Sequence, residues 1–151
     1  MKKFKFSLES MMHYKDALLD KEKNTLLQLR ATQTSMEQQI ERNEKQMLEL
    51  EADMKQKAML GTTAMELKTF EFHAENARKL IEQLQTDLVH LTALVEEQRK
   101  VVVALSQEVS GLEKLREKQL EEYNYGVQKE EEVRIGELIS SKYAAENPTQ
   151  S

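Results

Sequence analysis

Apolar residues recur every seven positions through the first third of the chain. Two series run from residue 8 to residue 54, one through Met12, Leu19, Leu26, Gln33, Ile40, Met47 and Met54, the other through Leu8, Lys15, Glu22, Leu29, Met36, Asn43 and Leu50. Ten of these fourteen positions are apolar, against 39% of the whole chain. Such a repeat is typical of a helix in a coiled coil. It predicts a first helix over about residues 7–60, with Ser7 as N-cap and Phe6 and Met11 as a hydrophobic staple.

The repeat is interrupted at Gly61, the only glycine among the first 110 residues. A glycine just beyond the last turn of a helix is a C-cap signal. Thr63 and Glu66 then have the spacing of a capping box, which marks the start of a new helix. The sequence therefore predicts a tight turn at about residues 60–63.

A second helix is predicted over about residues 64–145. Its apolar stripe runs through Phe70, Ala77, Leu84, Leu91, Gln98, Leu105 and Leu112 and is widened by Ile81, Leu88, Val95, Val102 and Val109, and the first strong stop is Asn147-Pro148. A short turn makes the two helices antiparallel, so residues whose numbers sum to about 124 should lie opposite each other. The predicted fold is all-α: a single-domain, antiparallel two-helix coiled-coil hairpin spanning residues 1–151, with helix 2 longer than helix 1.

Polar residues at three seam positions leave two interpretations open. Gln33, Asn43 and Gln98 either fix the register and oligomeric state of the coiled coil, or are polar layers that it tolerates.

The end of the second helix has no partner in this pairing. Leu8 should lie near residue 116, so that about residues 117–145 overhang, and the strong stripe fades after Leu115. The overhang still carries Leu120, Tyr123, Val127, Ile135, Leu138, Ile139 and Tyr143. Because an unpacked helix is marginal in water, two explanations stand: a self-associating or solvated tail, and a segment that docks on another protein.

Composition narrows the function further. The chain has no Cys, which excludes disulfides and thiolate metal sites, and its net charge of −5 does not indicate nucleic-acid binding. The basic start MKKFKF is followed by Glu9, Lys15 and Asp16 rather than by the apolar run of a signal peptide. No window approaches the ~18 apolar residues of a membrane span. We expect a soluble, cytosolic protein.

No catalytic chemistry is predicted. His13, His73 and His90 are scattered, with no second ligand at metal-binding spacing, and Gly61 stands alone rather than in a phosphate loop. A two-helix coiled coil also has no deep pocket in which to tune an acid or a base. We therefore expect no enzyme activity, no cofactor, no metal and no small-molecule substrate.

Three stretches resemble a known family. They are KFKFSLESMMHYKD at the start, GTTAMELKTFEFHAENARKLIEQL after the turn, and LEKLREKQLEEY with the later EEEVRIGELISSKY. In this order they are similar to FliJ, the small coiled-coil component of the bacterial flagellar type III export apparatus, along nearly the whole chain.

The resemblance implies a stalk-like protein, similar to the coiled-coil stalk of the rotary ATPase gamma subunit. Its implied partners are the hexameric flagellar export ATPase, the membrane export gate protein and export chaperones. Its implied place is the cytoplasm, peripheral at the cytoplasmic face of the inner membrane near the flagellar basal body. A self-associating structural coiled coil, or the equivalent small coiled-coil protein of a type III injectisome, is the alternative.

Candidate contact residues come from combining the resemblance with the pattern. Those expected to bind the ATPase are Arg116, Lys118, Leu120, Tyr123, Val127, Ile135 and Leu138, with the two cations facing acidic pore loops. Those expected to bind the export gate are Phe70, Phe72 and His73, which cannot all point into a two-helix seam because they lie on different faces of one helical turn.

Overall fold

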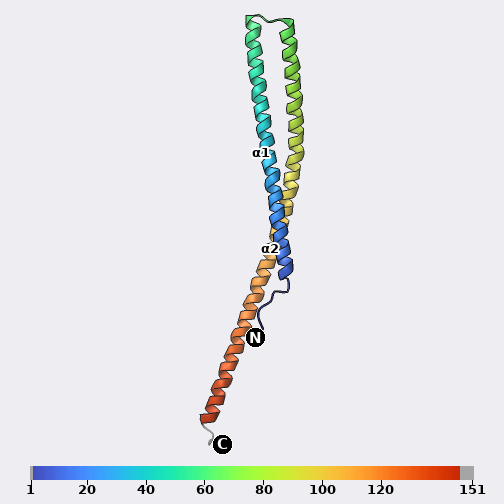
Figure 1. Ribbon diagram of the computed structural model, residues 1–151. Coiled ribbons are helices and arrows are strands. Elements are labelled where there is room, and N and C mark those ends of the chain that lie inside the picture. Colours follow the sequence, from blue (N-terminus) through green and yellow to red (C-terminus); the bar gives the residue numbers. More distant parts are fainter. Residues whose placement is uncertain (1, 147–151) are drawn as a thin grey trace. The chain divides into compact units, whose positions relative to one another are not determined.

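Two α-helices make up the fold. The computed structural model describes residues 2–146 and contains α1 (Glu9–Leu60) and α2 (Ala64–Glu146), with no strand in that range (Figure 1). The predicted fold class is confirmed: the protein is all-α, and the longer second helix packs against the first. The stop expected at Asn147-Pro148 lies outside the described residues.

Contacts within the chain divide it into two compact units. One unit is Leu19–Ala104, and the other joins the residues up to Leu18 with those from Leu105 onward. Each unit contains part of α1 packed on part of α2.

The predicted seam is the buried face of both helices. All fourteen heptad positions from residue 8 to residue 54, and all twelve stripe positions predicted on α2, are buried or half-buried. In the unit Leu19–Ala104 the buried side chains are Leu19, Leu26, Ile40, Met47, Met54, Ala74, Leu91 and Val95. Ala74, which the predicted stripe omits, is only 1% exposed and continues the three-and-four spacing between Phe70 and Ala77.

Two of the three polar seam residues form hydrogen bonds between the helices of this unit. Gln33 Nε2 donates to Thr92 Oγ1 at 3.2 Å, and Gln98 Nε2 donates to the Glu22 carbonyl at 3.0 Å. Asn43 instead donates to the Gln39 carbonyl of its own helix at 2.7 Å. Since a hydrogen bond between helices depends on their alignment, the bonds of Gln33 and Gln98 fit a role in setting the register, whereas the Asn43 bond lies within its own helix.

The turn between the helices follows from its sequence. Gly61 has φ +99°, in the left-handed region that favours glycine. The Glu66 N–H donates to Thr63 Oγ1 at 3.2 Å, as an N-cap bond does, and the Thr62 hydroxyl donates to the Glu66 carboxylate at 2.8 Å. The left-handed Gly61 follows the end of α1 at Leu60, and the Thr63 bond satisfies one backbone N–H in the first turn of α2.

In the other unit, α1 starts one residue later than a Ser7 cap would place it. The Glu9 N–H donates to the Phe6 carbonyl at 3.1 Å, and the first helical bond runs from the Met12 N–H to the Leu8 carbonyl at 2.9 Å.

The buried side chains of this unit are Phe6, Leu105 and Val109. Lys15 occupies a seam position and reaches Glu108 at 2.9 Å, and this hydrogen bond and opposite charge raise the pKa of Lys15.

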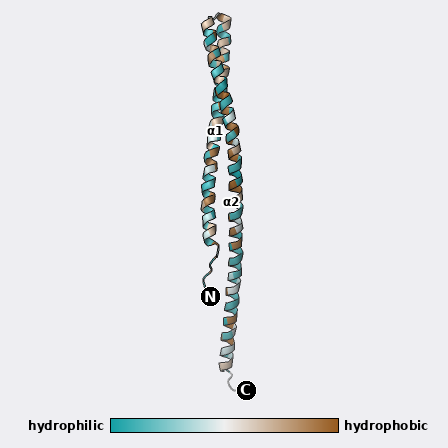
Figure 2. Cartoon of the chain, turned by 90° about the vertical axis from the view of Figure 1, so that its right-hand side faces the viewer, coloured by the Kyte–Doolittle hydropathy of each residue, from teal (hydrophilic) through white to brown (hydrophobic). Residues whose placement is uncertain are grey.

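Hydrophobic residues recur at intervals along both helices rather than in one long block (Figure 2). Within the described residues, neither helix has a stretch long and apolar enough to cross a membrane.

Candidate partner-binding surfaces

The end of α2 is exposed at every described position from residue 127 to residue 146. The large apolar side chains in it are Val127, Val133, Ile135, Leu138, Ile139 and Tyr143. Ile135, Leu138, Ile139 and Tyr143 follow the i, i+3, i+4, i+8 spacing of one helix face. Three of the residues expected to bind the ATPase, Val127, Ile135 and Leu138, therefore lie on an uncovered helix.

The other four expected residues lie in a different environment. Arg116, Leu120 and Tyr123 are half-buried, and only Lys118 is exposed. The N-terminal strap, the name used here for residues 2–6, precedes α1, runs beside α2 (Figure 1) and contacts two of the four, Arg116 and Tyr123. The seven residues thus form two neighbouring surfaces of α2, one uncovered and one in contact with the strap.

The N-terminal strap makes specific contacts with α2. The Phe4 ring centroid lies 5.6 Å from that of Tyr123, and the Arg116 guanidinium lies 5.6 Å from the centre of the same Phe4 ring. The Tyr123 hydroxyl donates to the Lys2 carbonyl. Arg116 also pairs with Glu9 of α1, Nε to Oε2, at 3.3 Å.

These contacts move the start of the uncovered helix. The pairing expected from the sequence sets Leu8 opposite residue 116 and so places the start of the uncovered helix near residue 117. In the structure the strap reaches Tyr123, and every described residue from 127 onward is exposed. The difference arises because the strap is not helical and so has no place in the helix register. The alternation of lysine and phenylalanine in KFKF was the one signal in the sequence for such a segment.

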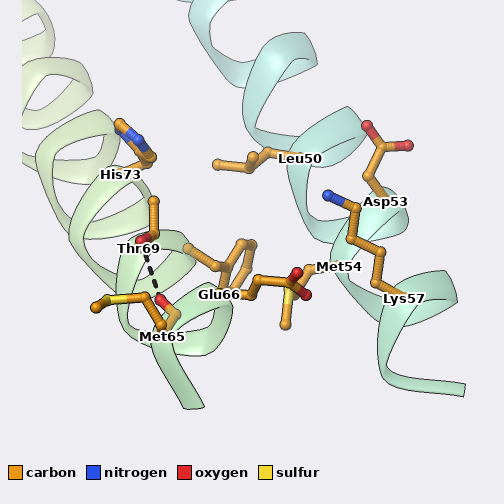
Figure 3. A pocket seen from close by; sticks show the side chains of 9 residues that line it. Leu50, Asp53, Met54, Lys57, Met65, Glu66, Thr69 and His73 are labelled. Carbon is orange, nitrogen blue, oxygen red and sulfur yellow. Dashed lines mark hydrogen bonds between the residues drawn. The ribbon is translucent and has the colours of Figure 1, made fainter. Parts of the chain in front are cut away.

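A second surface lies close to the turn, in the unit Leu19–Ala104. It is a pocket of about 300 Å³ lined by Leu50, Asp53, Met54 and Lys57 of α1 and by Met65, Glu66, Thr69, Phe70 and His73 of α2. Leu50 and Met54 project from α1 toward α2, and Glu66 projects back toward α1 (Figure 3). The pocket therefore combines an apolar interior with charged groups from both helices.

Two of the three residues expected at the export gate line this pocket. Phe70 and His73 belong to its wall, and Phe72 is 64% exposed beside it, its ring edge-on to His73 with centroids 5.8 Å apart. The sequence pattern assigned Leu50 and Met54 to the seam, and the expected pairing places Met54 opposite Phe70. It did not indicate that a pocket opens between the helices there.

Neither surface has the arrangement of a metal centre. Among the residues that the structure describes, no group of three His, Cys, Asp or Glu side chains is placed to hold a metal ion. What both surfaces offer is apolar side chains flanked by charges, which is the composition of a protein-binding site.

Comparison with protein families fits this arrangement. The model of the family described as flagellar FliJ protein matches residues 4–147. The chain belongs to the FliJ family. It is accordingly a component of the flagellar protein export apparatus, and the family is a structural and export family rather than a known enzyme family. Comparisons with curated proteins and with solved structures found no match. Both surfaces lie within the part matched to the FliJ family.

Proposed function

We propose that this FliJ family member is a stalk-like link in the export apparatus. The exposed end of α2 binds the hexameric export ATPase, and the surface beside the turn binds the membrane export gate protein. Export chaperones are a further class of partner. The protein acts in the cytoplasm, at the cytoplasmic face of the inner membrane near the flagellar basal body.

One observation carries the ATPase contact: a helix that is exposed throughout residues 127–146 yet keeps a face of large apolar side chains. Leu138 and Ile139 are 63% and 64% exposed. Helices of this length gain most of their stability from packing, so a partner that covers the apolar face stabilises the helix there. An apolar helix face inserted into a groove is a common mode of protein recognition.

A second copy of the chain is the other candidate occupant of this face, because the same apolar side chains suit a self-associating coiled coil. The family match supports the flagellar apparatus over an injectisome. The oligomeric state of the full chain, measured by sedimentation equilibrium with and without the exposed segment, separates self-association from binding to the ATPase.

The test of the ATPase contact is truncation after Gly126. Truncation after Lys118, the boundary expected from the sequence, removes Tyr123 and with it the ring contact to Phe4 and the hydrogen bond to the Lys2 carbonyl. Removing residues 127–151 keeps these contacts. We expect the thermal unfolding midpoint to change little, while binding to the ATPase and stimulation of ATP hydrolysis are lost.

A point variant in the full chain refines the test. Leu138→Glu places a charge in the exposed apolar face and should weaken ATPase binding. Val89→Glu is the matched control, because Val89 is 69% exposed on the same helix in the other unit. Full stimulation of the ATPase by the truncated chain would show that the exposed segment is a passive tail.

A further inference from the structure

The turn that joins α1 to α2 carries the most exposed large apolar side chains among residues 2–146. Leu60 is 83% exposed, Met59 82% and Met65 74%, and no other large apolar side chain in that range exceeds 69%. These three residues are called the apolar tip below. Because soluble proteins seldom gather such side chains at one exposed place, a concentration of them indicates a contact surface.

The geometry of the turn does not require these side chains. Turns are generally built from Gly, Pro, Asn, Asp and Ser, whereas residues 58–65 read AMLGTTAM and contain no charged residue. Gly61 supplies the left-handed backbone, and the Thr63 hydroxyl accepts the Glu66 N–H. Met59 and Leu60 have no part in either role, and neither belongs to the heptad series that form the seam.

Most of the apolar tip is also separate from the pocket near the turn. Met65 belongs to the wall of that pocket, but Met59 and Leu60 do not. Substitutions at Met59 and Leu60 therefore change the tip without changing the pocket wall.

Lysine side chains flank the apolar tip on both helices. Lys55 and Lys57 of α1 and Lys68 of α2 are exposed, and in the described part of the chain no ion pair involves them. The one acidic residue in the range 55–68 is Glu66, whose carboxylate accepts the Thr62 hydroxyl. Three lysines and one glutamate give this range a net charge of +2, in a chain whose net charge is −5.

We infer that the apolar tip binds an anionic lipid surface, with Met59 and Leu60 inserted between the headgroups. Binding of a protein segment to a lipid surface combines burial of apolar side chains with attraction between cations and anionic lipids. The tip and its flanking lysines supply both. This contact is additional to the proposed contacts with the ATPase and the gate protein and does not depend on them.

The arrangement of the side chains favours a lipid surface over a protein groove. A groove takes up one face of a helix, whereas the tip presents its apolar groups at the end of a hairpin, around the turn (Figure 1). The lysines stand behind them on both helices, where each can reach a headgroup when the end of the hairpin meets a plane of lipid. Lysine stems can lie along apolar groups while their ammonium groups stay in water.

The backbone of the turn limits how deep the tip can enter. The last carbonyl groups of an α-helix have no partner within the helix, and unpaired backbone groups are costly in the hydrocarbon region of a bilayer. The tip should therefore stay at the level of the headgroups, where water remains. A contact made by so few side chains is expected to be weak and reversible.

Cosedimentation of the full chain with lipid vesicles tests the inference. The wild type should bind vesicles of phosphatidylcholine and phosphatidylglycerol more tightly than vesicles of phosphatidylcholine alone. Met59→Gln/Leu60→Gln should weaken binding to the anionic vesicles by about tenfold, because two apolar side chains no longer insert. Leu27→Gln/Leu48→Gln is the matched control and should bind as the wild type does, since Leu27 and Leu48 are 64% and 66% exposed on α1 in the same unit.

A second pair of variants tests the lysines. Lys55→Gln/Lys68→Gln should weaken binding to the anionic vesicles several-fold and leave binding to phosphatidylcholine vesicles unchanged. Lys21→Gln/Lys23→Gln removes the same charge from an exposed part of α1 in the same unit, away from the turn, and should have little effect. Circular dichroism should show wild-type unfolding for all four double variants.

A fluorescent reporter measures the depth of insertion, because the chain contains no tryptophan. The emission of Leu60→Trp should shift to shorter wavelength when anionic vesicles are added. Lipids brominated near the headgroup should quench it more strongly than lipids brominated near the end of the acyl chain. Leu27→Trp should show neither effect.

The outcomes separate a lipid contact from a protein contact. The inference is overturned if the wild type does not bind anionic vesicles, if Met59→Gln/Leu60→Gln binds them as the wild type does, or if the emission of Leu60→Trp does not change. It is equally overturned if that double variant keeps vesicle binding but loses binding to the gate protein, which would make the tip a protein contact. Loss of vesicle binding with ATPase and gate binding intact supports the inference and leaves the proposed function as it stands.

Discussion

Phe70 and Phe72 stand two positions apart on α2, and this spacing separates their roles. Two residues turn a helix by about 200°, so the two rings point to nearly opposite sides. Phe70 lines the pocket near the turn, whereas Phe72 is 64% exposed and contacts His73 edge-on. A side chain of this size left in solvent, beside a pocket of mixed polarity, is a candidate anchor for a partner.

Phe72→Ala should therefore weaken binding to the export gate protein by tenfold or more while changing the free energy of unfolding by less than about 0.5 kcal/mol, as is usual for exposed positions. Binding is measured by titration calorimetry and stability by urea unfolding. Phe70→Ala is the contrasting variant and should destabilise the protein more, because it removes part of the pocket wall. A large stability loss from Phe72→Ala would assign that ring to the core instead.

At the scale of the elements, the end of α1 depends on Gly61. The residue adopts φ +99°, and a Cβ added to it would meet no atom within 4 Å. Any cost of a larger residue here therefore comes from the backbone conformation and not from crowding. Gly111, in α2, also has open space where a methyl group would lie, but it is within a helix, where glycine is unfavourable.

Gly61→Ala and Gly111→Ala should accordingly have opposite effects on stability. The first should destabilise by roughly 1–2 kcal/mol because of the left-handed conformation, and Gly61→Asn by less, since Asn tolerates it. The second should stabilise by roughly 0.5–1 kcal/mol. Chemical unfolding monitored by circular dichroism measures all three. Equal effects from the two alanine variants would contradict this account of the turn.

At the scale of the whole molecule, one antiparallel register holds in both units. Hydrogen bonds join Gln33 to Thr92 and Gln98 to Glu22 in one unit, and an ion pair joins Lys15 to Glu108 in the other. The numbers of these partners sum to 125, 120 and 123, close to the 124 expected from a turn at about residue 62. Each unit therefore keeps the pairing that the short turn imposes.

A cysteine pair at Leu29 and Val95, both in the unit Leu19–Ala104, tests this register. The two positions should form a disulfide within one chain in dilute solution, because the pairing sets them opposite each other. The protein has no cysteine of its own, so no other disulfide competes. Leu29 paired with Leu88 or with Val102, one heptad out of register, should not. Electrophoresis without reducing agent distinguishes the products. Crosslinks found solely between chains would replace the hairpin with a parallel dimer.

The sequence by itself determined the two helices, the turn and the seam. Heptad spacing, a glycine after the last helical turn and a capping box are local signals, and a seven-residue repeat indicates which face of a helix is buried. It also located the overhanging segment that includes Ile135 and Leu138, because the shorter first helix leaves the end of the second helix without a partner.

Only the tertiary structure decided which contacts form outside the pairing of the two helices. The strap contacts join Lys2 to Tyr123, residues far apart in the chain, through a segment with no helical period to align. The pairing brings Leu50 and Phe70 near each other, but the structure is needed to show that a pocket lies between their helices. Periodicity assigns a side chain to a face of its own element, whereas a contact also requires the position of the neighbouring chain.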